Sequence, residues 1–119
     1  MFPMSPRFAQ TVFYLSGPMS GLPDYNYPAF FEAESALFSQ GYLVANPART
    51  NLPEGSPWEA YMRDDLRKML GADAVVVLPG WETSRGARLE VQVAEALGMP
   101  IFAYPTLHRI HPGLSESSA

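Results

Sequence analysis

The segment DAVVVLP, residues Asp73–Pro79, is the clearest indication of the fold. Such an almost unbroken run of β-branched side chains is typical of a strand that is buried on both faces of a parallel sheet. Shorter β-rich runs, bounded by glycine or proline, predict further strands at residues 11–17, 42–47 and 99–105. The run at residues 73–79 is therefore expected to form the centre of a sheet.

Helical segments alternate with these strands. Residues 28–41 and 87–98 each end at a glycine, which is a common helix stop. Ser56 is followed three residues later by Glu59, a spacing that predicts an N-cap and a capping box. That helix is expected to continue to about residue 70.

The alternation of strands and helices predicts an α/β fold. Parallel strands joined by right-handed helical crossovers give a three-layer Rossmann-like (flavodoxin-like) parallel sheet of four to five strands with flanking helices. We expect one domain at residues 11–105, preceded by a flexible N-terminal segment at residues 1–10. Residues 106–119 are expected to form a C-terminal tail.

The composition excludes several classes of function. The chain has 119 residues, a net charge of −4 and only 8 lysines and arginines, so a partner such as a nucleic acid polymer is not expected. It contains no cysteine, and the sequence predicts neither a metal site nor a cofactor. A run of about 18 apolar residues and a signal-peptide pattern are both absent, so we expect a cytoplasmic location and no membrane contact.

The parallel sheet predicts where a ligand binds. Ligands of such sheets occupy the crevice outside the carboxyl ends of the strands. This rule selects three loops, at residues 16–27, 46–56 and 79–86. The substrate-binding residues are expected there, namely Ser16, Gly17, Ser20, Asn46, Trp81, Ser84 and Gly86.

An acidic residue lies inside the apolar stripe of the last predicted helix. Advancing about 100° per residue from Ala87 places Glu90 at about −60°, on the same side as Val91, Ala94 and Leu97. Glu90 is therefore expected to point inward. The alternative is a solvated or capping carboxylate, because burying an unpaired charge costs several kcal/mol.

The preceding helix repeats this pattern. Counted from Trp58 at about 100° per residue, Asp65 falls at about −20°, within the apolar arc, whereas Asp64 falls outside it. Two inward carboxylates facing one cleft suit the chemistry of a glycosidic bond. One can attack an anomeric carbon while the other handles a proton or a hydroxyl group.

The loops contain further candidates, each with a structural alternative. The amides at the helix start near Ser84 favour an anion such as phosphate, although Thr83 or Ser84 could simply cap the helix. Tyr25, Tyr27 and Trp81 could stack a base, or they could pack the loops or a dimer contact.

Three segments together resemble the nucleoside 2-deoxyribosyltransferase superfamily, which includes the 2'-deoxynucleoside 5'-phosphate N-hydrolases. They are YLSGPMSG, RDDLRKMLGADAVVVLPG and SRGARLEVQVAEALGMPIFAY. The resemblance covers roughly residues 12–104 and is greatest to small, often phage-associated members. It implies that Glu90 is the nucleophile toward the sugar C1', that Asp65 assists at the sugar or leaving base, and that the Tyr14 hydroxyl positions Glu90.

The same resemblance implies that Ser84 contacts a 5'-phosphate. The sequence departs from that pattern in one place, because Ser20 stands where the phosphate-using members have an arginine. A serine can donate a hydrogen bond but carries no charge. Arg85 is expected to take the place of that arginine in preference to Arg88, which falls on the solvent-exposed face of its helix.

The expected function is cleavage of the N-glycosidic bond of a (deoxy)nucleoside or its 5'-monophosphate, with hydrolysis favoured over transfer. The expected partners are this small molecule and a second copy of the chain, in a homodimer or higher homo-oligomer. A non-catalytic nucleotide-binding or sensor module on the same fold is one alternative. An interaction protein whose inward acids are structural is another.

Overall fold

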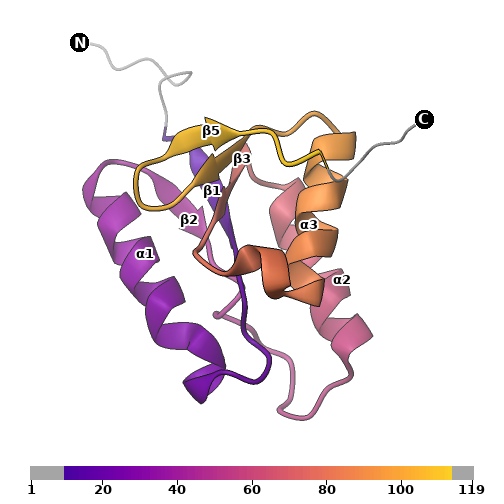
Figure 1. Ribbon diagram of the computed structural model, residues 1–119. Coiled ribbons are helices and arrows are strands. Elements are labelled where there is room, and N and C mark those ends of the chain that lie inside the picture. Colours follow the sequence, from indigo (N-terminus) through magenta and orange to yellow (C-terminus); the bar gives the residue numbers. More distant parts are fainter. Residues whose placement is uncertain (1–9, 114–119) are drawn as a thin grey trace.

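The predicted central run forms strand β3 (Ala74–Val77), and all four of its residues are buried. The computed structural model of the protein, which describes residues 10–113, contains a five-stranded sheet in the order β2-β1-β3-β4-β5 (Figure 1). Strands β1 to β4 are parallel, and β5 runs antiparallel to β4. The other strands are β1 (Val12–Ser16), β2 (Leu43–Ala45), β4 (Ile101–Ala103) and β5 (His108–Ile110).

Helices cover both faces of this sheet. Helix α1 (Tyr27–Ser39) lies on one face, and α2 (Trp58–Leu70) and α3 (Arg85–Ala96) lie on the other (Figure 1). Two short 3-10 turns, η2 (Pro23–Asn26) and η3 (Trp81–Thr83), precede α1 and α3. The predicted α/β class and the three-layer Rossmann-like arrangement are confirmed.

Alternation along the strands divides the core into two clusters. Phe13 and Leu15 of β1 pack with Phe30 of α1, whereas Tyr14 packs with Val91 of α3. Successive side chains of a strand point to opposite faces of a sheet. The face that carries Tyr14 therefore also carries Ser16, and it is the face that α3 covers.

Three details differ from the sequence prediction. Strand β5 lies inside the segment 106–119 that was predicted to be a tail. Ser56 is not the N-cap of α2, because Pro57 occupies that position and the Ser56 hydroxyl donates to the Pro53 carbonyl at 2.6 Å. Leu97 was predicted to be inward but is 61% exposed, because α3 ends at the preceding residue.

Residues 1–9 of the predicted flexible N-terminal segment and residues 114–119 of the predicted tail lie outside the described part of the chain. Within residues 10–113, no helix combines the length and the apolar character needed to cross a membrane.

Candidate functional site

A cleft of about 500 Å³ opens at the carboxyl end of β1. This edge is the topological switch point of the sheet, because the chain leaves β1 and its neighbour β3 in opposite directions along the sheet. Its lining comes from residues 17–30 on one side, from the loop at residues 47–56, and from α2 and the start of α3 on the other side. A cavity of this size suits a small molecule.

Glu90 lies in the cleft with both carboxylate oxygens hydrogen-bonded. The Tyr14 hydroxyl donates to Oε2 at 2.8 Å, and the Ser16 hydroxyl donates to Oε1 at 2.6 Å. The Glu90 side chain is only 4% exposed, and Tyr14 and Ser16 are fully buried. The inward orientation predicted for Glu90 is confirmed.

The local structure explains this geometry. Tyr14 and Ser16 are two residues apart on β1, so both point toward α3. The Ser84 hydroxyl accepts a hydrogen bond from the Ala87 amide at 3.1 Å and caps α3, which fixes the start of this helix. Glu90 lies in the second turn of α3, so its carboxyl group reaches the end of β1.

Burial is the largest influence on the Glu90 carboxyl and raises its pKa to about 8. The charge of Asp65 acts in the same direction, whereas the hydrogen bonds from Ser16 and Tyr14 lower the pKa. Burial and the neighbouring Glu90 charge also raise the pKa of Tyr14 well above its usual value. Tyr14 therefore keeps its proton and remains a donor to Glu90.

Asp65 lies on the α2 wall of the same cleft and is half-buried. Burial raises the pKa of Asp65 to about 7, the charge of Lys68 lowers it and the charge of Asp64 raises it. Lys68 forms an ion pair with Asp64, at 3.1 Å between Nζ and Oδ2. The cleft thus holds two carboxyls that both resist ionisation at neutral pH.

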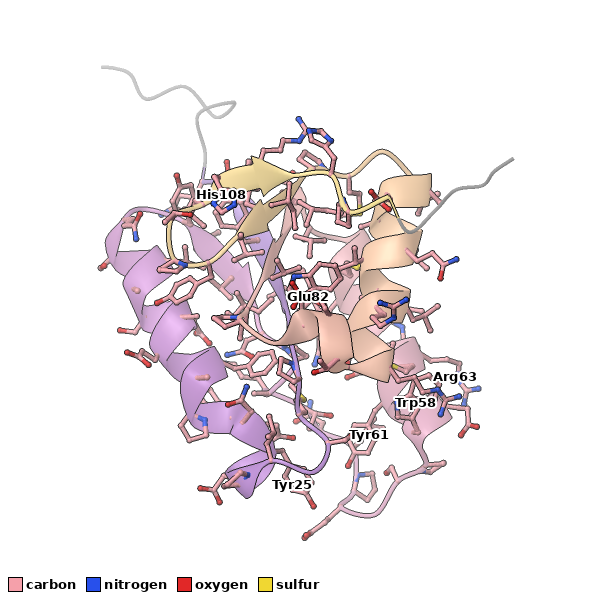
Figure 2. All side chains as sticks on the ribbon, viewed as in Figure 1. Tyr25, Trp58, Tyr61, Arg63, Glu82 and His108 are labelled. Carbon is pink, nitrogen blue, oxygen red and sulfur yellow. The ribbon has the colours of Figure 1, made fainter. Side chains whose placement is uncertain are left out.

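Aromatic side chains surround the mouth of the cleft. Tyr25 and Tyr27 line the wall next to α1, and their ring centroids are 5.8 Å apart. Trp58 and Tyr61 line the wall formed by α2. Figure 2 shows Tyr25, Trp58 and Tyr61 toward the lower end of the molecule, where β1 ends.

Trp58 and Tyr61 were not predicted as site residues. The angular count that selected Asp65 already placed both in the same arc of the helix. Because they share this arc with an inward-pointing acid, the sequence could have identified them as residues that line the cleft.

The segment that carries Tyr25 has an unusual backbone. Asp24, Tyr25 and Asn26 have φ values of 52°, 53° and 60°, which lie in the left-handed region. Non-glycine residues pay roughly 1–2 kcal/mol each for this conformation. The Asn26 side-chain amide donates to the Pro18 carbonyl at 3.0 Å and holds the segment against the loop after β1.

Four of the predicted binding residues, Gly17, Ser20, Ser84 and Gly86, line the cleft, and Ser16 lies beneath it on Glu90. Both glycines are needed for close packing. A Cβ at Gly17 would lie 2.9 Å from the Cβ of Leu78, and one at Gly86 would lie 3.1 Å from the Sδ of Met62.

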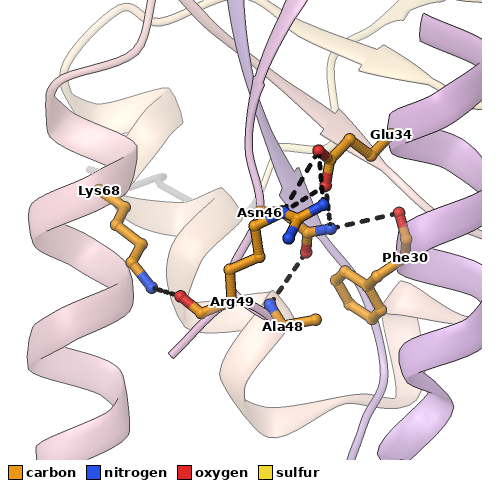
Figure 3. A network of polar contacts seen from close by, with 6 residues as sticks. All are labelled: Phe30, Glu34, Asn46, Ala48, Arg49 and Lys68. Carbon is orange, nitrogen blue, oxygen red and sulfur yellow. Dashed lines mark hydrogen bonds and ion pairs between the residues drawn. The ribbon is translucent and has the colours of Figure 1, made fainter. Parts of the chain in front are cut away.

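Asn46 and Trp81 do not line the cleft. The Asn46 amide donates to Glu34 at 2.7 Å, and its oxygen accepts from the Ala48 amide at 2.9 Å, so this side chain holds the loop after β2 (Figure 3). Trp81 is 9% exposed and packs in the core cluster that contains Tyr14. The predicted roles of both residues in substrate binding therefore lack support from their positions.

A second hollow of about 600 Å³ adjoins the cleft and shares five lining residues with it, namely Met19, Ser20, Trp58, Ser84 and Gly86. Arg85 lines this hollow, with its guanidinium carbon 3.7 Å from the centroid of the Trp58 ring. Arg88 instead donates to the Glu82 carbonyl at 3.5 Å. Arg85 is therefore the arginine beside the candidate site.

In the part of the chain described here, no group of three or more histidine, cysteine, aspartate or glutamate side chains is arranged to hold a metal ion. No curated protein is significantly similar to the chain. Residues 11–103 match one protein family. This range includes the sheet up to β4 and the hydrogen-bonded residues Tyr14, Ser16 and Glu90. The chain belongs to the family described as Domain of unknown function (DUF4406).

Proposed function

We propose that this protein cleaves the N-glycosidic bond of a (deoxy)nucleoside or its 5'-monophosphate through a covalent glycosyl intermediate on Glu90. The products are the free base and, after reaction with water, the free sugar or sugar phosphate. The observation that carries the proposal is the buried Glu90 carboxyl, held through both oxygens by Tyr14 and Ser16 inside the cleft. The resemblance to the nucleoside 2-deoxyribosyltransferase superfamily supports the same role for Glu90.

In the first step, a Glu90 oxygen attacks C1' of the sugar, the bond from C1' to the base nitrogen breaks, and Asp65 donates its proton to the leaving base. The two hydroxyl donors restrict the carboxylate to one orientation and favour its ionised form. In the second step, water attacks C1', Asp65 accepts a proton from this water, and the Glu90 carboxylate is released. Attack by a second base in place of water would give transfer.

The direct test is release of free base from a panel of ribo- and deoxyribonucleosides and their 5'-monophosphates, without an acceptor base. We expect wild type to release base and Glu90→Gln to lose at least about a thousandfold in rate, because an amide is a poor nucleophile. Glu95→Gln changes an acid on the same helix that does not line the cleft, and it serves as the control. Equal rates for wild type and Glu90→Gln would refute the proposal.

The covalent step has a separate test. A 2-fluoro nucleoside slows the second step because fluorine destabilises the positive charge that develops on the sugar. Mass spectrometry of the intact protein should then detect a sugar adduct, and peptide mapping should place it on Glu90. An adduct on another residue would contradict the assigned nucleophile.

A second candidate function is a non-catalytic nucleotide-binding module. The pKa of about 8 for Glu90 favours this candidate, because the carboxyl of the free protein is then largely protonated at neutral pH. Such a module would bind members of the panel without releasing base at any pH between about 6 and 9.

The proposal includes a homodimer or higher homo-oligomer, as the resemblance implies. Leu22 and Tyr25 are exposed apolar side chains close to the candidate site, which supports a contact there. Sedimentation velocity of wild type and Leu22→Asp tests this part, and a wild-type monomer at all concentrations would refute it.

A further inference from the structure

Within residues 10–113, the carboxylic acids that line the cleft have no basic side chain among them. Three carboxyl groups line it, on Glu54, Asp65 and Glu90. Among the described residues, no lysine, arginine or histidine lines it. From the described part of the chain, the ligand therefore meets acidic groups on several sides and no fixed positive group, and a bound cation favours the ionised forms of Asp65 and Glu90.

Two cations close to the cleft, Lys68 and Arg85, already have partners. Lys68, whose charge acts on Asp65, forms an ion pair with Asp64 and donates to the Arg49 carbonyl at 2.9 Å. Arg85 lines the neighbouring hollow and stacks on Trp58. Neither side chain neutralises the cleft from within.

The remaining walls are rich in aromatic rings. Tyr25, Tyr27, Phe30, Trp58 and Tyr61 all line the cleft. Aromatic faces attract cations through their quadrupole, most strongly where water is excluded. The contact between Arg85 and Trp58 shows that one of these rings already accepts a cation.

We propose that the cleft selects nucleosides whose base carries a fixed positive charge, such as an N-glycosylated pyridinium or an N7-alkylated purine. This inference rests on the proposed function and specifies its substrate class. Aromatic rings and acidic groups together recognise a flat cationic ring, whereas a 5'-phosphate would bring negative charge beside acidic groups with no cation among the described lining residues to neutralise it.

The chemistry of such a substrate fits the residues present. When Glu90 attacks C1', the electron pair of the breaking bond moves to the base nitrogen and cancels its positive charge. The base leaves as a neutral molecule and needs no proton, so a general acid is not required in this step. Water then attacks C1', its proton passes to Asp65, and Glu90 regains its negative charge.

Binding tests the charge selection without any turnover. The probes are 1-methylnicotinamide, a pyridinium cation, and 3-methylbenzamide, its neutral carbon isostere, which share one shape and lack a sugar. We expect the cation to bind about tenfold more tightly by NMR titration, and high salt to reduce this preference. Equal or tighter binding of the neutral isostere would overturn the inference.

Two variants assign the effect to the cleft. Glu54→Gln removes a carboxylate that lines it, and the preference for the cation should fall about threefold. Glu59→Gln removes an exposed carboxylate from the first turn of α2 that does not line the cleft, and the preference should not change. An equal loss in both variants would point to the overall charge of the protein and overturn the inference.

Turnover separates this inference from the proposed function. Base release is measured from a pyridinium nucleoside and from neutral nucleosides, each as the ratio of enzymatic to uncatalysed rate. A larger ratio for the pyridinium nucleoside supports the inference. Cleavage of neutral nucleosides without selective binding of the cation overturns the inference and leaves the proposed function intact. Selective binding of the cation without cleavage of any nucleoside overturns the proposed function alone.

Discussion

At Glu90, burial and hydrogen bonding act on the carboxyl pKa in opposite directions. Burial raises this pKa, and the donors Ser16 and Tyr14 lower it. The shorter of the two hydrogen bonds, at 2.6 Å, comes from Ser16. This serine was predicted to bind substrate, but its position makes it a positioning residue that acts through Glu90.

The Ser16→Ala variant tests this role. The loss of one donor to the ionised carboxylate should raise the pKa of Glu90 by about one further unit. NMR titration of the Glu90 carboxyl carbon measures the shift directly. Ser39→Ala removes an exposed serine hydroxyl that bonds only to its own helix, and it should leave the titration unchanged. An unaltered Glu90 titration in Ser16→Ala would show that Ser16 has only a packing role.

The Glu90→Gln variant has a predicted effect on stability. The pKa of Glu90 rises from 4.5 to about 8 on folding, so the folded protein binds more protons between these values and wild-type stability falls as pH rises through that range. The variant should therefore be more stable than wild type by about 2–4 kcal/mol at pH 8 and by less than about 1 kcal/mol at pH 5. Urea unfolding at both pH values measures the difference, and an equal gain at both would contradict the pKa assignment.

The sequence predicts single residues well where helical periodicity applies. The angular count correctly turned Glu90 and Asp65 inward, because both lie within regular helices. Asn46 was chosen because it ends a strand, and Trp81 because it follows a strand and could stack a base, but neither reason gives the direction of a side chain. The inward orientation predicted for Leu97 was wrong because the angular count was continued past the end of α3.

Among the elements, the join between β1 and its loop is the most tightly packed part of the candidate site. Gly17 directly follows β1, and the backbone there runs against the Leu78 side chain. The close approach keeps the carboxyl ends of β1 and β3 together. The hydrogen bond from Ser16 to Glu90 depends on that spacing, because Ser16 directly precedes Gly17.

The Gly17→Ala variant should be destabilised. Its Cβ would lie 2.9 Å from the Cβ of Leu78, and relief of such a contact costs about 1–3 kcal/mol. Gly71→Ala is the matched control, because its Cβ would have no neighbour closer than 3.7 Å and its φ of −87° suits alanine. Urea unfolding of both variants measures the effect. A Gly17→Ala variant as stable as Gly71→Ala would show that the loop can move away from Leu78.

The ends of elements were harder to predict than their existence. The Ser56 and Glu59 pair fits a capping box in sequence, yet the Ser56 hydroxyl bonds backward to Pro53. A serine beside a proline can satisfy its hydroxyl within a turn as well as at a helix start. Sequence spacing alone does not distinguish these two arrangements.

At the scale of the whole molecule, the alternation of strands and helices was sufficient to predict the fold. Each crossover is long enough for a helix, and the apolar, valine-rich run at Ala74–Val77 indicates a central strand. The antiparallel strand β5 was missed because its three residues, His108–Ile110, are largely polar or exposed. An edge strand needs only one neighbour and carries little apolar signal.

Strand β5 is expected to contribute to stability despite its weak signal. Ile110 packs against the cluster that contains Ile101, and the two residues face each other across β4 and β5. For a chain that ends at residue 105, the free energy of unfolding in urea should fall by about 2 kcal/mol or more. The reason is that β4 loses its hydrogen bonds to β5 and Ile101 becomes exposed. Arg109→Ala, on the exposed side of β5, is the control and should have little effect. Unchanged stability of the shortened chain would contradict this account.

The left-handed run at Asp24–Asn26 also has a consequence in time. A segment that stores a few kcal/mol of backbone strain opens more often than its surroundings, so its amides should exchange with solvent early. Hydrogen-exchange rates at residues 24–27 should exceed those of β1 and fall when a cleft ligand contacts Tyr25 and Tyr27. The rate at which this short segment opens would then limit how fast a bound ligand leaves the cleft, and so would set its residence time.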